Sequence, residues 1–188
     1  MSLHDDHRAL VGVAAFGFLF LSLTIAVLPA YEAQKTPPLT LSAPSAEVRR
    51  GRELYLKEGC GVCHTQFVRN LAVDAPYGRG SVAGDFAAED PPLLGTQRTG
   101  PDLANAGVRQ PGETWHLIHL FNPRAVVPTS VMPAYPWYFD VKAAADPDDL
   151  VVPVPDRFKP AGGTVVARAD AIAIVRYLQS LAQPELPP

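Results

Sequence analysis

The sequence has little of what several common kinds of functional site require. Its 188 residues include two cysteines and two methionines, and its formal net charge is −3. One cysteine pair is too few for the disulfide framework of a small secreted domain, and a four-ligand zinc site would need a second pair. A mildly acidic chain also lacks the basic face of nucleic-acid-binding proteins. We therefore expect neither a disulfide-stabilised fold nor a nucleic-acid partner.

One long apolar run lies near the N-terminus. Residues Ala9–Leu28 contain no charged residue and no proline. At about 1.5 Å per residue the run is roughly 30 Å long as a helix, which matches the apolar core of a bilayer. A buried helix and a cleaved signal peptide are the alternatives to a membrane anchor, and the flanking charges, Arg8 and Lys35, barely decide an orientation. We predict an N-terminal segment 1–8, an anchor 9–29 and a linker 30–44.

The two cysteines, Cys60 and Cys63, lie in the stretch GCGVCHTQFVR and are followed at once by His64. C-x-x-C-H is the attachment signature of a c-type haem. Two thiols about one helical turn apart can each bond one haem vinyl group, and the adjacent histidine can then ligate the iron. A thioredoxin-like redox pair would be expected in a βαβ unit, which the pattern does not show. We predict one covalently attached haem c, with His64 as an axial ligand of its iron.

The second axial ligand is sought among the few remaining candidates. Met132 is the one methionine besides the first residue, and it lies in the stiff, proline-rich loop VPTSVMPAYPWY. Isolated methionines are usually core filler, but this loop carries no helical apolar stripe. The rivals are His116 and His119 in WHLIHL. We predict Met132 as the ligand, because it lies between Pro128 and Pro133 in this stiff loop. Ligation by a histidine and a methionine would then raise the reduction potential of the haem relative to ligation by two histidines.

A further element is the stretch TGPDL, Thr99–Leu103. The carbonyl of Pro101 could accept a hydrogen bond from the ring N–H of His64, and such a partner fixes the orientation of a ligating histidine. The alternative is a simple Gly-Pro turn.

The rest of the chain predicts short helices joined by long loops, as its 20 prolines suggest. Apolar periodicity and capping residues predict three helices, two loops and one short β-hairpin. The helices are Ser45–Gly59, Gly112–Phe121 and Asp170–Gln183; the loops are Leu71–Arg109 and Val126–Phe139; the hairpin joins Val151–Val154 to Thr164–Ala167.

Together these segments resemble class I cytochromes c, with Gly51 and Tyr55 spaced as in the helix of that class that crosses the last helix. More narrowly, the chain is similar to the mono-haem subunit of cbb-type cytochrome c oxidases over roughly residues 50–139. It departs at Phe67 and Asn70, where that family usually has methionine and proline. The segments that carry the resemblance are GCGVCHTQFVR, YGRGSVAGDF, PPLLGTQRTGPDLANAGVRQP, WHLIHLFNPRAVVP and SVMPAYPWYF.

The resemblance implies a mainly α chain with a class I cytochrome c fold and one N-terminal transmembrane helix. The cytochrome c domain would span 45–188, with a core of 45–139 and 168–183 and an insertion at 140–167. It further implies that Arg98 and Arg124 pair with the haem propionates; the alternative is that both arginines are solvated at the surface. The side chains expected to line the haem are Trp115, Tyr135 and Trp137; the alternative is that they pack in the core.

The resemblance also implies a function in electron transfer. The subunit would take single electrons from a second c-type cytochrome or a soluble cytochrome and pass them to a catalytic haem–copper subunit. In that family covalent haem attachment takes place outside the cytoplasm, so the resemblance implies a haem domain on the periplasmic side of the bacterial cytoplasmic membrane. The alternatives are the small subunit of a haem–copper nitric oxide reductase, a free-standing anchored carrier, and a haem sensor with an open sixth position.

Overall fold

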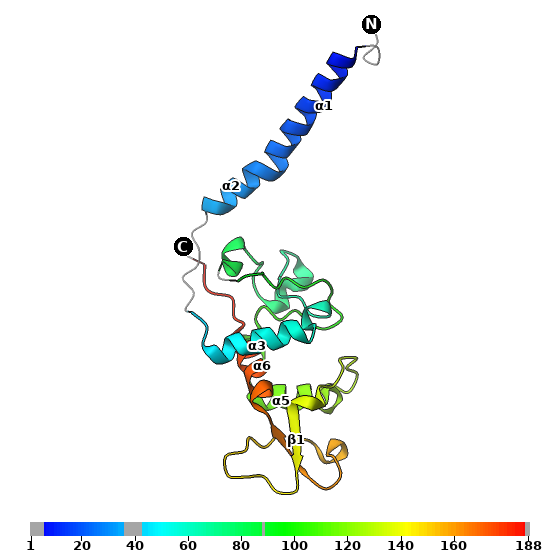
Figure 1. Cartoon of the computed structure of the whole chain (residues 1–188), viewed down its shortest axis with the longest axis vertical. Helices are drawn as coiled ribbons and strands as arrows, with labels where there is room; N and C mark the ends of the chain where they lie inside the picture. Colours follow the sequence, from blue (N-terminus) through cyan, green and yellow to red (C-terminus); the bar gives the residue numbers. More distant parts are fainter. Residues whose placement is uncertain (1–5, 36–42, 88, 187–188) are drawn as a thin grey trace. The chain divides into compact units, whose positions relative to one another are not determined.

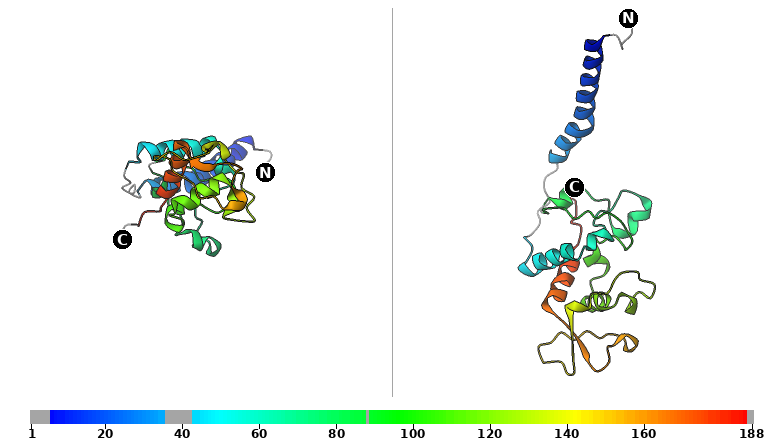
Figure 2. Two further views of the ribbon diagram at one scale, coloured as in Figure 1. Left: turned by 90° about the horizontal axis from the view of Figure 1, so that it is seen from below. Right: turned by 45° about the vertical axis from the view of Figure 1, so that its right-hand side comes forward.

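The computed structural model describes residues 6–35, 43–87 and 89–186. The chain forms two compact units (Figures 1 and 2). The first is Met1–Thr40 with Val82–Ala87, and the second is Leu41–Ser81 with Ala88–Pro188. The described residues are mainly helical, as predicted, with one apolar helix at the N-terminal end.

The N-terminal unit contains a long helix built from three consecutive elements: α1 (His7–Leu21), the π-helix η1 (Ser22–Val27) and α2 (Leu28–Lys35). Asp6 caps it, because its Oδ1 accepts hydrogen bonds from the N–H groups of Arg8 (3.0 Å) and Ala9 (3.2 Å). The stretch His7–Glu32 is long and apolar enough to cross a membrane, and its side chains are not buried in the chain.

This helix runs further than predicted. The anchor was expected to end at residue 29, whereas α2 continues to Lys35, so the beginning of the predicted linker 30–44 is helical. Polar residues end the apolar run without breaking a helix, since neither glycine nor proline follows Ala30 before residue 36. The next part of the predicted linker, 36–42, lies outside the described residues.

In the second unit, α3 (Ala46–Lys57) crosses the last helix, α6 (Ala169–Ser180) (Figure 1). Ser45 caps α3 as predicted, accepting a hydrogen bond from the Val48 N–H at 3.2 Å. The crossing is tight at Gly51, where an added Cβ would lie 2.7 Å from Tyr177 Cβ. At the edge of the crossing, the Arg50 guanidinium binds both carboxylate oxygens of Asp170, at 3.0 and 3.1 Å.

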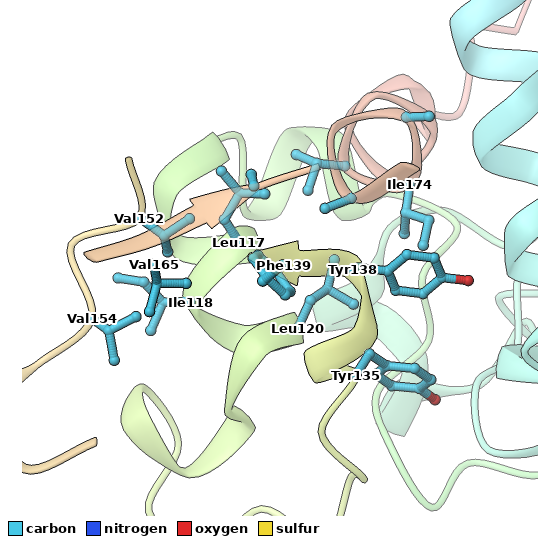
Figure 3. Packing of buried hydrophobic residues seen from close by; sticks show 14 of the residues in the cluster. Leu117, Ile118, Leu120, Tyr135, Tyr138, Phe139, Val152, Val154, Val165 and Ile174 are labelled. Carbon is cyan, nitrogen blue, oxygen red and sulfur yellow. The ribbon is translucent and has the colours of Figure 1, made fainter. Parts of the chain in front are cut away.

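The main hydrophobic core lies around α5 (Glu113–Phe121) and α6. Figure 3 shows Leu117, Ile118 and Leu120 of α5 among valines of the neighbouring strand and loop, with Ile174 of α6 on the other side. Short 3-10 helices connect the larger elements: η2 (Cys60–Val62), η3 (Ala72–Tyr77), η4 (Ala83–Phe86), η5 (Pro123–Ala125), η6 (Pro136–Tyr138) and η7 (Asp156–Phe158). The predicted loop Leu71–Arg109 also contains a four-residue helix, α4 (Ala106–Arg109), which is too short to produce a periodic signal.

The strand pairing corrects one prediction. Thr164–Ala167 is a strand, β2, but its partner is β1 (Phe139–Lys142), paired antiparallel with Phe139 opposite Ala167. The expected partner, Val151–Val154, makes a single bridge between Val151 and Val166. Proline at positions 153 and 155 removes the N–H donors that a longer ladder would need. Side chains of the expected insertion 140–167 nevertheless belong to the core, among them Val152, Val154 and Val165.

Candidate functional site

The two cysteines lie on a tight turn at the end of α3. Gly59 has a φ of 69°, in the left-handed region that favours glycine, and η2 begins directly after it. The N–H groups of Cys63 (3.1 Å) and His64 (3.0 Å) both donate to the carbonyl of Cys60. The two thiols are therefore held within about one helical turn of each other, which is the spacing that C-x-x-C-H predicts.

The Cys60 side chain is partly buried, and Cys63 is exposed. Burial, assisted by the charge of Glu58, raises the pKa of the Cys60 thiol to about 11, and the Tyr135 hydroxyl lies within hydrogen-bonding reach of its sulfur. The thiol is thus protonated near neutral pH, unlike the thiolates of reactive redox pairs.

His64 makes the contact that the sequence predicted. Its Nδ1 lies 2.8 Å from the carbonyl oxygen of Pro101, and because a carbonyl only accepts, Nδ1 carries the proton. Burial lowers the pKa of His64, and the Pro101 bond and the Asp102 charge oppose this shift. The ring is therefore neutral at pH 7, with an unprotonated Nε2 available to a metal. A Cβ at Gly100 would come within 2.8 Å of both ring nitrogens, so this backbone approaches the ring as closely as only glycine allows.

Arg98 is engaged with protein oxygens. Its Nε donates to Thr65 Oγ1 at 2.7 Å, Nη1 to Asp74 Oδ1 at 2.5 Å, and Nη2 to the Phe67 carbonyl at 2.7 Å. Its expected role toward a haem propionate stays a prediction, and its visible role is to join loops. The guanidinium groups of Arg69 and Arg98 hold the pKa of Asp74 well below its usual range.

Sequence reasoning missed Thr65, Asp74 and Asp102 as partners in the site. Asp74, in the short helix η3, and Asp102, in a loop, are fully buried carboxylates in segments without apolar periodicity, so no pattern separates them from solvated aspartates. The one local signal was that Asp102 directly follows Pro101.

Helix α5 contributes Trp115 and two histidines. The buried His116 bonds the Gln110 carbonyl through Nε2 at 2.7 Å. His119 stacks on the Trp115 ring, with 4.7 Å between ring centroids and 11° between planes. Burial, and then the charges of His116 and His64, lowers the pKa of His119 to about 4. Its Nδ1 is buried and, among the described residues, has no hydrogen-bond partner.

The remaining expected residues lie beyond α5. Met132 is partly buried against the core, and its N–H donates to Ser130 Oγ at 3.2 Å. Tyr135 is buried, whereas Trp137 is 52% exposed and meets the Tyr135 ring edge-on, with 5.3 Å between centroids. Arg124 is exposed in η5. The roles of Met132 as ligand, Arg124 as propionate partner and the aromatic side chains as haem lining stay predictions.

The donor set fits a haem better than a protein-coordinated metal ion. Over 6–35, 43–87 and 89–186, no three His, Cys, Asp or Glu side chains cluster as metal ligands. Within these ranges the chain does place two thiols within one turn, a neutral histidine whose Nε2 has no hydrogen-bond partner, and a buried His119 nitrogen without one. A separate open groove of about 650 Å³, lined among others by Tyr77, Arg79 and Arg109, contains none of the expected haem residues.

These features define a chain with an apolar N-terminal helix and a small helical unit that presents a haem-attachment motif. The family model described as "Cytochrome C oxidase, mono-heme subunit/FixO" matches residues 5–152, and the chain therefore belongs to this family. The members of this family are mono-haem cytochrome c subunits of haem–copper oxidase complexes. The match confirms the resemblance seen in the sequence. It implies one haem and a catalytic oxidase partner. The matched range includes every expected site residue. No curated protein matches the chain significantly.

Proposed function

We propose that this chain is the membrane-anchored electron-transfer subunit of a cbb-like terminal oxidase, which passes single electrons to the catalytic haem–copper subunit. The observation that carries the proposal is the geometry around His64. The ring is neutral, its Nδ1–H donates to Pro101, and its Nε2 has no hydrogen-bond partner among the described residues, while the two thiols lie on the turn that leads into His64. This arrangement suits a haem held by thioether bonds from Cys60 and Cys63.

Each part of the site has a separate task in this proposal. The thiols of Cys60 and Cys63 would hold the haem covalently through its vinyl groups, and His64, through Nε2, and Met132 would be the ligands of its iron. A haem bound in this way supplies reversible one-electron oxidation and reduction, with no open position for oxygen. The Pro101 carbonyl fixes the tautomer and orientation of His64.

The N-terminal helix is the proposed anchor in the bacterial cytoplasmic membrane. His7–Glu32 suffices to span a bilayer. Because covalent haem attachment in this class takes place outside the cytoplasm, we place the N-terminus inside and the haem unit on the periplasmic side. A second c-type cytochrome or a soluble cytochrome is the proposed electron donor.

The ligand assignment is tested by Met132→Ala, with Val131→Ala as a matched control. Val131 is the exposed neighbour of Met132, with 73% of its surface accessible, so its truncation leaves the axial position untouched. We expect the Met132→Ala protein to keep its covalent haem and to show a markedly lower reduction potential in spectroelectrochemical titration, because a thioether ligand raises the potential. An unchanged potential would exclude Met132 as the ligand.

The partner is tested by purifying the intact complex from membranes. We expect a multi-helix subunit with non-covalent haem and copper to co-purify and to turn over oxygen. Turnover of nitric oxide instead of oxygen would assign the complex to the reductases, and a monomeric cytochrome would make the chain a free-standing carrier.

A further inference from the structure

The loop that follows Thr99 is bonded closely to the segment that contains His64. The N–H of Leu103 donates to the carbonyl of Thr65 at 2.7 Å. Directly beside this bond, His64 Nδ1 meets the Pro101 carbonyl at 2.8 Å. The Pro101 carbonyl can hold the imidazole in one orientation only if its own peptide is fixed, and the next residue, Asp102, fixes it.

The Asp102 carboxylate is fully buried and is surrounded by donors. Its Oδ2 accepts hydrogen bonds from Thr65 Oγ1 at 2.5 Å and from the Phe67 N–H at 3.0 Å. Its Oδ1 accepts from the Ala104 N–H at 2.9 Å. One side chain therefore ties the loop directly after Pro101 to the residues directly after His64.

Arg98 compensates the buried charge. Its Nη2 lies 3.3 Å from Asp102 Oδ2, its Nε bonds the same Thr65 hydroxyl, and its Nη1 bonds Asp74. The Arg98 side chain is 17% exposed, so these interactions are largely shielded from water. Buried ion pairs of this kind often add little to stability compared with apolar packing, because desolvation offsets the Coulomb attraction. Their placement against an iron ligand points to a geometric task.

We propose that the Thr65–Asp102–Arg98 network is a positioning device for the axial histidine. The network holds the Pro101 carbonyl against His64 Nδ1, so that the imidazole presents Nε2 in a single orientation. The proposal rests on the proposed function, because it takes His64 to be the iron ligand. None of the three residues is an expected iron ligand; each acts through the backbone of the two bonded segments.

The test compares Thr65→Val with Thr65→Ser in the full-length, haem-loaded chain. Thr65→Val removes the hydroxyl that joins Asp102 to Arg98 without changing the charge, whereas Thr65→Ser keeps that hydroxyl. For Thr65→Val we expect about a tenfold change in the equilibrium between oxidised and reduced forms, which is about 59 mV for one electron. We also expect a broader spread of low-spin signals in the electron paramagnetic resonance spectrum of the oxidised protein. Thr65→Ser should match the unsubstituted chain in both measurements.

Equal potentials and equal spectra for the two variants would overturn the proposal, even if Thr65→Val lowers the melting temperature. If Thr65→Val fails to load haem, hydrogen exchange of the unsubstituted protein decides. The amides of Phe67 and Leu103 should then exchange as slowly as those at the crossing of α3 and α6, and fast exchange would overturn the proposal. Failure of the proposed function looks different, because the unsubstituted chain itself would lack covalent haem or histidine ligation.

Discussion

Gly51→Ala should destabilise the protein at the crossing of α3 and α6. The added Cβ would lie 2.6 Å from the Ala173 carbonyl carbon and 2.7 Å from Tyr177 Cβ, and closer still to the Ala173 carbonyl oxygen. Two of these atoms belong to the backbone, so no side-chain rotation relieves the contact and the helices must separate. Overpacking of this kind lowers the free energy of unfolding by about 1–3 kcal/mol, and the higher helix propensity of alanine offsets up to about 1 kcal/mol of that loss.

The expected net loss is about 2 kcal/mol in the free energy of unfolding, or a fall of roughly 4–8 °C in melting temperature for a unit of this size. Circular dichroism of the detergent-solubilised chain measures both quantities. Gly80→Ala is the matched control: its Cβ would lie 3.4 Å from Asn70 Cβ, an ordinary contact, and its effect should stay within about 0.5 kcal/mol. If Gly51→Ala is as stable as that control, the helices do not meet as closely as the structure shows. Because α3 leads into Cys60, the variant should also incorporate less haem.

Two further predictions concern the surroundings of the site. Gly100→Ala places a Cβ within 2.8 Å of both nitrogens of the His64 ring, so we expect the ring to turn away from Pro101 and the optical spectrum to lose its low-spin character; a spectrum like that of the unsubstituted protein would contradict the close approach. The pKa of His119 is about 4 in the folded chain, because burial disfavours its charged form, against about 6.5 when unfolded. The unfolded state therefore binds more protons between these values, and stability present above pH 6.5 is lost as the pH falls toward 4, by roughly 3 kcal/mol for this group. His119→Gln should flatten that part of the pH profile measured by denaturant titration, whereas an unchanged slope would assign it to other groups.

The features predicted from the sequence were those with a local pattern. Helices α3, α5 and α6 have capping residues or apolar periodicity, and the contact of His64 with Pro101 follows from two short motifs. The pairing of β1 with β2 was not predictable from local pattern. Two segments, 139–142 and 151–154, could pair with β2, and the outcome depends on which of them has the N–H donors that a ladder needs. The network at Thr65 was missed for a related reason: Thr65 and Asp102 are 37 positions apart, and buried and solvated aspartates look alike in a loop.

A loop-rich domain can depend on a bound cofactor to organise its loops, but on one side of this site the chain organises them itself. Around His64 the loops are bonded to each other through Asp102, Arg98 and Asp74, whose polar atoms have protein partners. Around α5 the buried Nδ1 of His119 has none within the described ranges, and a buried nitrogen without a partner costs about 1–3 kcal/mol. The His64 side is therefore formed by the chain itself, whereas the buried Nδ1 of His119 on the α5 side is a polar atom that the haem of the proposed function would have to satisfy.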